Sequence, residues 1–280
     1  MIKLIADWLY PFARPPLPEP KLATGFFTDT TLCIGCKACE VACKQWNQIP
    51  SDGFQFSGNS YDNSSTLSST TWRHVKFIEQ FQNAATAPAE GARDRWLMMS
   101  DVCKHCSGAP CEAACPTGAL ITNEYSNVYI QNDICNGCGY CVAVCPFGVI
   151  TRGDFDGHAH KCTLCYDRQR DDLIPACAKS CPTGSIQFGY LDDLRERATA
   201  RLAEVSSRGF EGARLYGDEA SAEYPELNSF FLLLDAPSVY GLPDSPKMPQ
   251  RNIAADSLRA GLATVAWLAI VLGAVVIHGV

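Results

Sequence analysis

The chain has 280 residues, enough for one or two domains, and its hydrophobic content of 47% excludes a wholly disordered protein. It carries 23 basic and 30 acidic residues, which gives a formal net charge of −7. Because a surface that binds phosphates needs an excess of basic residues, this balance argues against a nucleic-acid-binding protein.

Residues 1–27 are predicted to form an N-terminal arm that ends in a proline-rich linker. Apolar residues recur in it at helical spacing: Ile2, Ile5, Trp8, Leu9 and Phe12. The apolar run is too short for a secretory signal and is interrupted by an aspartate. We expect a short amphipathic helix that packs on the protein, and a helix that lies on a membrane surface is the alternative.

Sixteen cysteines dominate the sequence, and all of them fall into four groups of four. The groups are Cys33, Cys36, Cys39 and Cys43; Cys103, Cys106, Cys111 and Cys115; Cys135, Cys138, Cys141 and Cys145; and Cys162, Cys165, Cys177 and Cys181. Four is the ligand number of tetrahedral metal sites and of iron–sulfur clusters. The grouping therefore predicts four metal-containing sites.

The spacing within the groups distinguishes three kinds of site. Disulfide scaffolds are shorter chains with cysteines spread across loops, and adjacent C-x2-C pairs are poorly placed to bridge each other. Zinc sites separate two C-x2-C pairs by a dozen or more residues, which fits the fourth group but neither the first nor the third. The third group, CNGCGYCVAVCP, has the C-x2-C-x2-C-x3-C-P spacing of bacterial ferredoxins. We therefore predict four [4Fe–4S] clusters.

Residues 28–190 are predicted to form one ferredoxin-like domain that holds all four clusters. Three groups end in similar sequences, namely CPTGALI from Cys115, CPFGVIT from Cys145 and CPTGSIQ from Cys181. These repeats indicate an internal duplication, so the expected fold class is α+β with two pseudo-symmetric double-cluster units. The polar segment 51–70 is expected to be a surface insertion, and residues 72–77 a strand.

Small residues are expected to bring the loops of the first and third groups close to their clusters. Gly35 lies in the first group, and Gly137 and Gly139 lie in the third. Glycine adopts backbone conformations that other residues avoid, and it leaves room for the backbone to approach a cluster. Backbone N–H groups would then donate hydrogen bonds to sulfur and tune the reduction potential.

Residues 191–256 are predicted to contain a helix and a connecting segment. Apolar residues at helical spacing predict a helix packed on the cluster domain: Leu191, Leu194, Ala198, Leu202 and Val205. The run FFLLL at 230–234 predicts a buried strand.

Residues 257–280 are predicted to form a single C-terminal transmembrane helix. They include AGLATVAWLAIVLGAVVI, a run of 18 residues without a charge. A helix of that length measures about 27 Å, close to the thickness of a hydrocarbon core. A buried core helix is the alternative.

The ligands of each cluster are expected to come from two groups. In two-cluster ferredoxins the fourth cysteine of a run binds the other cluster, and the duplication extends this rule along the chain. Pairing the second group with the third, and the first with the fourth, gives the following sets: cluster A, Cys33, Cys36, Cys39 and Cys181; cluster B, Cys43, Cys162, Cys165 and Cys177; cluster C, Cys103, Cys106, Cys111 and Cys145; cluster D, Cys115, Cys135, Cys138 and Cys141. No catalytic residues are predicted, and His105 is expected to support the ligands rather than bind iron.

Several stretches are distinctive beyond the cysteine spacing. They are LCIGCKACEVACKQWN, KCTLCYDR and PACAKSCPTGSIQFG, followed by LYGDEASAEYPELNSF and YGLPDSPKM. From Thr28 onward the chain resembles the beta, iron–sulfur subunit of membrane-bound formate dehydrogenases. The pair Trp46 and Asn47 and the C-terminal apolar run favour this family among relatives that share the cysteine framework.

The resemblance implies an electron-transfer subunit that has no catalytic site of its own. Formate would be oxidised at molybdenum or tungsten, held by two pyranopterin cofactors in a catalytic partner subunit. The electrons would pass through four [4Fe–4S] clusters to a membrane cytochrome b or another quinone-reactive subunit. The resemblance also implies the crossed ligation described above.

The resemblance further implies that the chain lies in the cell membrane with its cluster domain on the outer face, exported in folded form with the catalytic partner. Basic residues before the expected span, Lys247, Arg251 and Arg259, indicate the opposite orientation by the positive-inside rule. That rule describes unfolded segments as they insert, so we expect the outer face.

Two alternatives stay open for the function. The chain could be the corresponding subunit of a polysulfide, tetrathionate or dimethyl sulfoxide reductase, because these subunits share the cysteine framework. It could also be a zinc-stabilised scaffold, which would contain zinc and no acid-labile sulfide.

Overall fold

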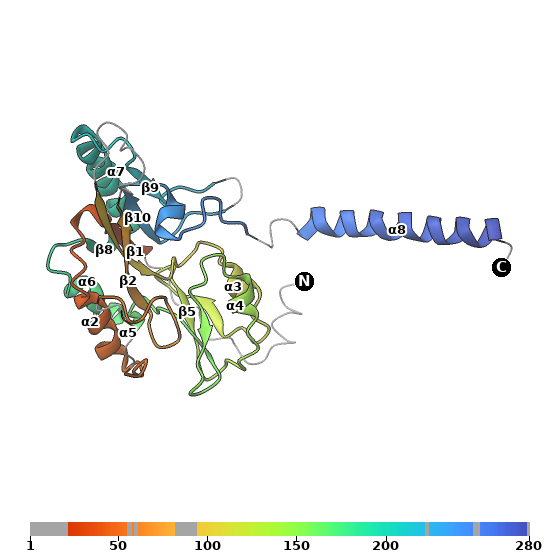
Figure 1. The fold of residues 1–280 in the computed structure, drawn as a ribbon. Helices are drawn as coiled ribbons and strands as arrows, with labels where there is room; N and C mark the ends of the chain where they lie inside the picture. Colours follow the sequence, from red (N-terminus) through yellow and green to blue (C-terminus); the bar gives the residue numbers. More distant parts are fainter. Residues whose placement is uncertain are drawn as a thin grey trace, which may run out of the picture.

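The structure is a computed structural model that describes residues 22–54, 58, 61–81, 94–221, 224–248 and 253–278. The predicted N-terminal arm lies outside these residues except for its last positions. Helices and strands are mixed along the described chain, as the predicted α+β class requires (Figure 1).

The strands are β1 (Thr24–Asp29), β2 (Arg73–Gln80), β3 (Arg95–Val102), β4 (Leu120–Thr122), β5 (Val128–Ile130), β6 (Thr151–Arg152), β7 (Ala159–His160), β8 (Ile186–Tyr190), β9 (Arg214–Tyr216) and β10 (Ser229–Leu233). The helices are η1 (Thr30–Leu32), α2 (Ala38–Asn47), α3 (Pro110–Ala113), α4 (Tyr140–Val144), α5 (Tyr166–Arg170), α6 (Ala176–Lys179), α7 (Leu191–Ser207), η2 (Pro237–Tyr240) and α8 (Ile253–His278).

A four-stranded sheet of order β8–β1–β10–β9 joins the two ends of the folded body. β1 pairs in parallel with β10, with Phe27 opposite Phe230, and antiparallel with β8, with Phe27 opposite Gln187. The predicted strand at 230–234 is therefore confirmed as β10. Because β10 lies beside β1, the region after the fourth cysteine group is built into the same sheet as the strand before the first.

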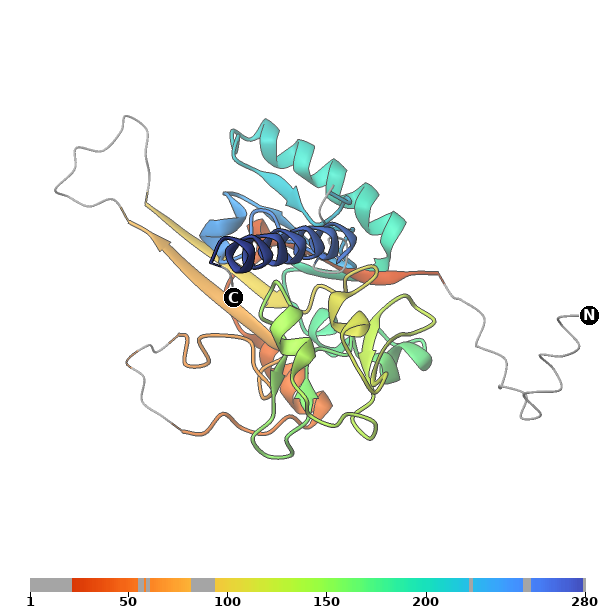
Figure 2. The same ribbon diagram turned by 90° about the vertical axis from the view of Figure 1, so that its right-hand side faces the viewer.

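The sheet separates two packed layers because successive side chains of a strand point to opposite faces. Phe27 packs with Leu194, Phe230 and Leu232 against α7, which confirms the helix predicted to follow the fourth group. Phe26, the neighbouring residue of β1, instead packs among the buried cysteines. Figure 2 shows α7 on one side of the body and the short helices and strands of the cysteine layer on the other.

The strand predicted at 72–77 is confirmed as β2, which forms a long antiparallel hairpin with β3 (Figure 2). Arg73 opens the hairpin opposite Val102, directly before the second cysteine group. The described residues of the predicted insertion, 51–70, contain no helix or strand. Leu67 and Ser69 within it are nevertheless buried, so this segment is partly packed onto the body rather than confined to the surface.

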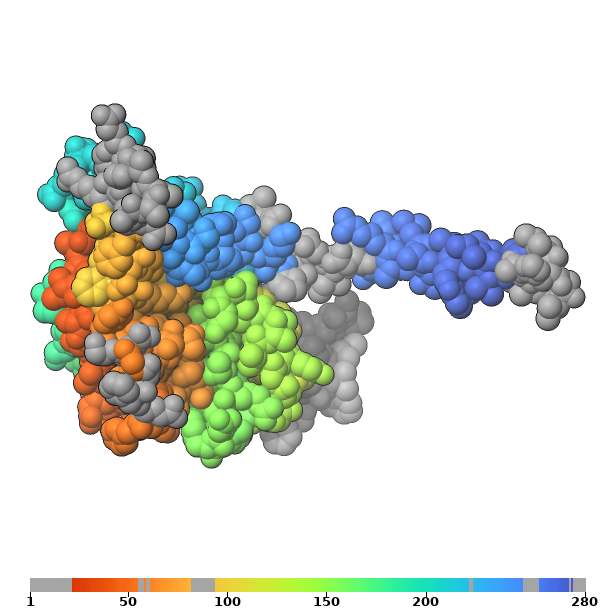
Figure 3. Space-filling model, in the orientation of Figure 1, coloured from red at the N-terminus to blue at the C-terminus, as the bar shows by residue number. Residues whose placement is uncertain are grey.

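The residues predicted to cross a membrane form helix α8, which extends away from the body (Figures 1 and 3). Among the described residues, however, no helix is both long enough and apolar enough to cross a membrane. An apolar run predicts a helix, which is observed, but a membrane span also requires sufficient length and sustained hydropathy. The predicted transmembrane helix is therefore not supported.

Candidate iron–sulfur sites

Residues with positive φ fold the first and third cysteine loops in the same way. Gly35 and Lys37 have φ of 67° and 58° in the first loop, and Gly137 and Gly139 have φ of 69° and 79° in the third. A Cβ on Gly35 would lie 2.6 Å from the Phe77 ring. Positive φ favours glycine at all three positions, and the close approach of Phe77 adds a steric reason at Gly35, although Lys37 shows that one position tolerates a side chain. Approach of these loops to clusters stays a prediction.

The loops lead directly into helices that carry the later cysteines of each group. Cys39 and Cys43 lie in α2, and Cys141 lies in α4. In the second and fourth groups, α3 and α6 carry Cys111 and Cys177. A short helix thus recurs beside each site, as an internal duplication predicts.

The three CP-x-G sequences form the same turn after the last cysteine of their groups. The N–H groups of Gly118, Gly148 and Gly184 donate to the carbonyls of Cys115, Cys145 and Cys181 at 3.3, 3.3 and 3.4 Å. Each glycine has positive φ, and each turn leads towards a strand, β4, β6 or β8. The proline supplies the fixed φ of the turn and ends the preceding helix. In the first group no proline follows Cys43, and α2 continues to Asn47.

The cysteines predicted for cluster A line one pocket. Cys33, Cys36, Cys39 and Cys181 come from a loop, from α2 and from the last CP-x-G turn. Burial raises the pKa of the Cys33 thiol, and the thiols of Cys181 and Cys36 raise it further. The structure therefore brings Cys181 to the first group although it lies more than 140 residues along the chain.

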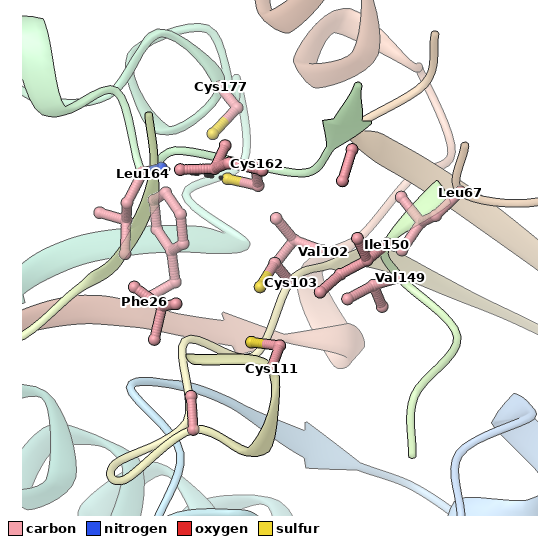
Figure 4. Packing of buried hydrophobic residues seen from close by; sticks show 14 of the residues in the cluster. Phe26, Leu67, Val102, Cys103, Cys111, Val149, Ile150, Cys162, Leu164 and Cys177 are labelled. Carbon is pink, nitrogen blue, oxygen red and sulfur yellow. Dashed lines mark hydrogen bonds between the residues drawn. The ribbon is translucent and has the colours of Figure 1, made fainter. Parts of the chain in front are cut away.

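The thiol of Cys43 lies among thiols of the fourth group instead of those of its own. Burial raises its pKa well above the ordinary value, and the thiols of Cys162, Cys177 and Cys165 add to this effect. Figure 4 shows the sulfur atoms of Cys162 and Cys177 near each other, and Cys177 also acts on the pKa of Cys162. These four residues are the set predicted for cluster B.

Thiols of the second and third groups also influence one another. Burial raises the pKa of Cys106 to about 12, and the thiols of Cys103 and Cys145 contribute to it. Figure 4 shows the sulfur atoms of Cys103 and Cys111 close together in this region. Burial and the thiols of Cys135, Cys138 and Cys115 raise the pKa of Cys141 to about 11. The thiols of the sets predicted for clusters C and D thus influence one another, while ligation by these sets stays a prediction.

The possible metal ligands among the described residues are not arranged as a single-ion site. Among the described residues, no group of three or more His, Cys, Asp or Glu side chains could hold one ion. Four sulfur atoms around one zinc ion would each lie about 2.3 Å from it. An iron–sulfur cluster is larger than one ion, and its ligands therefore stand farther apart.

Fully buried cations beside the thiols supply a second test of what the sites hold. Lys104 is paired with Asp101, whereas Lys161 donates only to the carbonyls of Val128 and Cys162. Neither Lys161 nor the buried Arg73 has a carboxylate partner within the described residues. A buried charge without a counter-charge is strongly unfavourable. Thiolate-bound clusters, which carry negative charge, fit these surroundings and would supply the missing counter-charge.

Two side chains outside the cysteine motifs contact thiols, and a buried histidine lies within the second motif. Tyr224 donates from its hydroxyl to the Sγ of Cys106 at 3.1 Å, and Ser100 Oγ lies 3.3 Å from the Sγ of Cys39. His105 is fully buried, and burial together with Lys161 keeps its pKa well below the ordinary value, so the ring is neutral. Sequence reasoning singled out only His105, because Ser100 and Tyr224 lie in no cysteine motif.

Comparison with known proteins agrees with this interpretation of the sites. Two models described as 4Fe–4S dicluster domains match residues 32–119 and 94–191. Together they contain all sixteen cysteines, which fit four [4Fe–4S] clusters. These matches contradict the zinc-scaffold alternative and confirm that the chain is built from two dicluster ferredoxin-like units.

Individual relatives cover most of the chain. The iron–sulfur subunit of formate dehydrogenase-O from Escherichia coli is 40% identical over 224 residues, which are 79% of this chain and 71% of that protein. The formate dehydrogenase iron–sulfur subunit of Haemophilus influenzae is 38% identical over 236 residues, 84% of this chain and 73% of that protein. The B subunit of anaerobic dimethyl sulfoxide reductase from Escherichia coli is 30% identical over 178 residues, 62% of this chain and 76% of that protein. The protein described here therefore belongs to the family of formate dehydrogenase iron–sulfur subunits.

Proposed function

We propose that this electron-transfer subunit serves a formate-oxidising complex and carries electrons through four clusters in series. The observation that carries the proposal is the adjacency of the four cysteine sets, which makes one continuous route through the body. When bound, the clusters accept and release single electrons. The protein holds them, excludes water and supplies charges and hydrogen bonds that set their potentials.

We infer that the order of the sites is A, B, C and D. The thiol of Cys177 in set B raises the pKa of Cys39 in set A, after the larger effect of burial. Burial raises the pKa of Cys162 to about 12, and its strongest thiol neighbour is Cys103 of set C. Sets C and D are joined through the crossed positions of Cys115 and Cys145. These neighbours support a single file of sites without a branch.

The two ends of this order lie nearest to the surface. Cys36 of set A and Cys138 of set D are the exposed cysteines, whereas Cys43, Cys162, Cys165 and Cys177 of set B are all buried. Electrons therefore have an accessible entry and exit at opposite ends of the row of sites.

We propose that a catalytic subunit with a molybdenum or tungsten bis-pterin cofactor adjoins one end. A cytochrome b or other quinone-reactive subunit would adjoin the other end and attach the complex to the cell membrane, with the cluster domain on its outer face.

The proposed substrate is tested by activity of the intact complex. The complex that co-purifies with this protein is expected to reduce an artificial dye when formate is added, and to contain molybdenum or tungsten. Reduction with dimethyl sulfoxide, tetrathionate or polysulfide as oxidant, in the absence of formate activity, would instead establish the reductase alternative. The 30% identity to a dimethyl sulfoxide reductase subunit is the observation that favours this second candidate.

We also propose the crossed ligation of all four clusters. It is supported by the thiol neighbours of Cys43, which all belong to the fourth group. It is also supported by Cys145 beside Cys106 and by Cys115 beside Cys141, since each of these neighbours comes from the partner group. The CP-x-G turns support it as well, since each turns the chain sharply at the crossing cysteine.

Replacement of single ligands tests the crossing at Cys145. We expect Cys145→Ser to remove or convert the same electron paramagnetic resonance signal as Cys106→Ser, because both residues would bind cluster C. The matched control is Cys138→Ser, which should affect a different signal, that of cluster D. If Cys145→Ser and Cys138→Ser instead lose the same signal, the third group binds one cluster and the crossing is wrong.

A further inference from the structure

Arg73 is the largest fully buried side chain, and it is not a residue of any cysteine group. It opens β2, and its guanidinium lies over the ring of Phe26 at 4.6 Å. Its Nη1 donates to the carbonyl and the hydroxyl of Ser100 at 3.4 and 3.2 Å. Its Nε and Nη2 have no hydrogen-bond partner among the described residues. Two donors of a buried cation therefore lack a protein acceptor within the part of the chain that the structure describes.

The thiols around Arg73 come from two cluster sites. Burial lowers the pKa of the guanidinium, but the thiols of Cys177, Cys39, Cys162 and Cys43 outweigh burial and raise it. Cys39 belongs to set A, and the other three belong to set B. Arg73 therefore lies between two cysteine sets and stays cationic there. It also lowers the pKa of Cys39 and of Cys162, against the larger effect of burial.

Ser100 connects Arg73 to set A specifically. Its hydroxyl accepts from Nη1 of Arg73 and lies 3.3 Å from the Sγ of Cys39. A hydroxyl that accepts from a cation directs its own proton towards another acceptor, and a thiolate is such an acceptor. The Arg73–Ser100 contact joins the two strands of the hairpin, and Ser100 then reaches Cys39 on α2. The unpartnered Nε and Nη2 leave two donors of the guanidinium for set B, whose thiols also act on Arg73.

We propose that Arg73 is a positioning residue shared by clusters A and B, which raises the reduction potentials of both. A reduced cluster carries one more negative charge than an oxidised cluster, so a fixed buried cation and its N–H donors favour the reduced state. Because one guanidinium serves two sites, it shifts both potentials in the same direction. This inference rests on the proposed cluster sets and goes beyond the proposed function by assigning the residue that couples two of the clusters.

The test is a redox titration of the purified complex, followed by electron paramagnetic resonance, with dithionite and mediators. Arg73→Gln is expected to weaken reduction of two of the four clusters about tenfold, a shift of about 59 mV to lower potential for a one-electron step. Arg73→Lys keeps the positive charge but loses the planar guanidinium with its several N–H donors. It should therefore lower the potentials of the same two clusters by less. Arg208→Gln changes an exposed arginine that pairs with Glu204 at the end of α7, so it is the control and should shift none.

Ser100→Ala distinguishes the contribution at cluster A from that at cluster B. It also provides a second measurement if Arg73→Gln does not assemble with its clusters. It should lower the potential of one cluster only, the one whose signal disappears in Cys36→Ser. Unchanged midpoints of all four clusters in Arg73→Gln, at full iron and sulfide content, would overturn the proposal. If Arg73→Gln lacks clusters, unchanged midpoints in both Arg73→Lys and Ser100→Ala would overturn it as well. The titration uses no formate, so absence of formate activity would refute the proposed substrate and leave this result standing.

Discussion

Individual residues from outside the cysteine motifs make up much of what surrounds the thiols. Tyr224 is buried, donates to Cys106 and packs edge-on against Phe147, with ring centroids 5.6 Å apart. Lys104 and Lys161 each lie next to a cysteine in the sequence, so their position was visible there, but their complete burial was not. Tyr224 and Arg73 reach their sites only because distant segments fold together.

The hydroxyl of Tyr224 is expected to tune cluster C. Tyr224→Phe removes one hydrogen bond to a ligand sulfur and leaves the ring in place. A hydrogen bond to a charged acceptor contributes roughly 1.5–3 kcal/mol, and only part of this differs between redox states. We therefore expect the potential of one cluster to fall by about 20–60 mV, where 59 mV corresponds to a tenfold change. The measurement is a redox titration of the intact complex.

A matched tyrosine provides the control for this change. Tyr240 packs in the same apolar cluster as Tyr224, but its hydroxyl accepts from the N–H of Leu234 and contacts no cysteine. Tyr240→Phe should leave all four potentials unchanged. Equal shifts in the two variants would show that packing, rather than the hydrogen bond, sets the potential.

At the level of helices and strands, local repeats were predictable and long-range pairing was not. The three CP-x-G turns and the glycine loops follow from residues within a few positions of each other, and the structure contains them as expected. The pairing of β1 with β10 joins residues about 200 positions apart, with Phe26 opposite Ser229. The run 230–234 indicated a strand but carried no information about its neighbour. The apolar tail likewise indicated a helix but did not establish a membrane span.

In the whole molecule, two layers differ in what stabilises them. The layer of β1, β10 and α7 has its own apolar core of phenylalanine and leucine side chains, including Phe27, Phe230 and Leu194. The cysteine layer is built on short strands and short helices around the thiols. Elements this short are marginal without tertiary contacts. The clusters are therefore expected to contribute most of the stability of the second layer.

Removal of iron tests whether the clusters stabilise the cysteine layer more than the layer of β1, β10 and α7. Anaerobic chelation should leave Arg73 and Lys161 buried without counter-charge and should vacate the space between the thiols. We expect amide hydrogen exchange in residues 103–181 to approach the rate of an unfolded chain, while α7 and β10 keep measurable protection. Uniform loss of protection over both layers would show that the sheet also depends on the clusters. Retention of protection in both layers would show that the protein alone stabilises the cysteine layer.

The amino-acid sequence was sufficient to identify the chemistry of this protein. Sixteen cysteines at ferredoxin spacing, with prolines and glycines between them, restrict the local backbone and the ligand type, because both depend on near neighbours. Folding in three dimensions was needed for what depends on distance between remote residues: Arg73 between two cysteine sets, Tyr224 on Cys106, and β10 beside β1. Burial and electrostatic contact arise only when separate segments pack, so the residues that tune the clusters could not be read from the motifs that hold them.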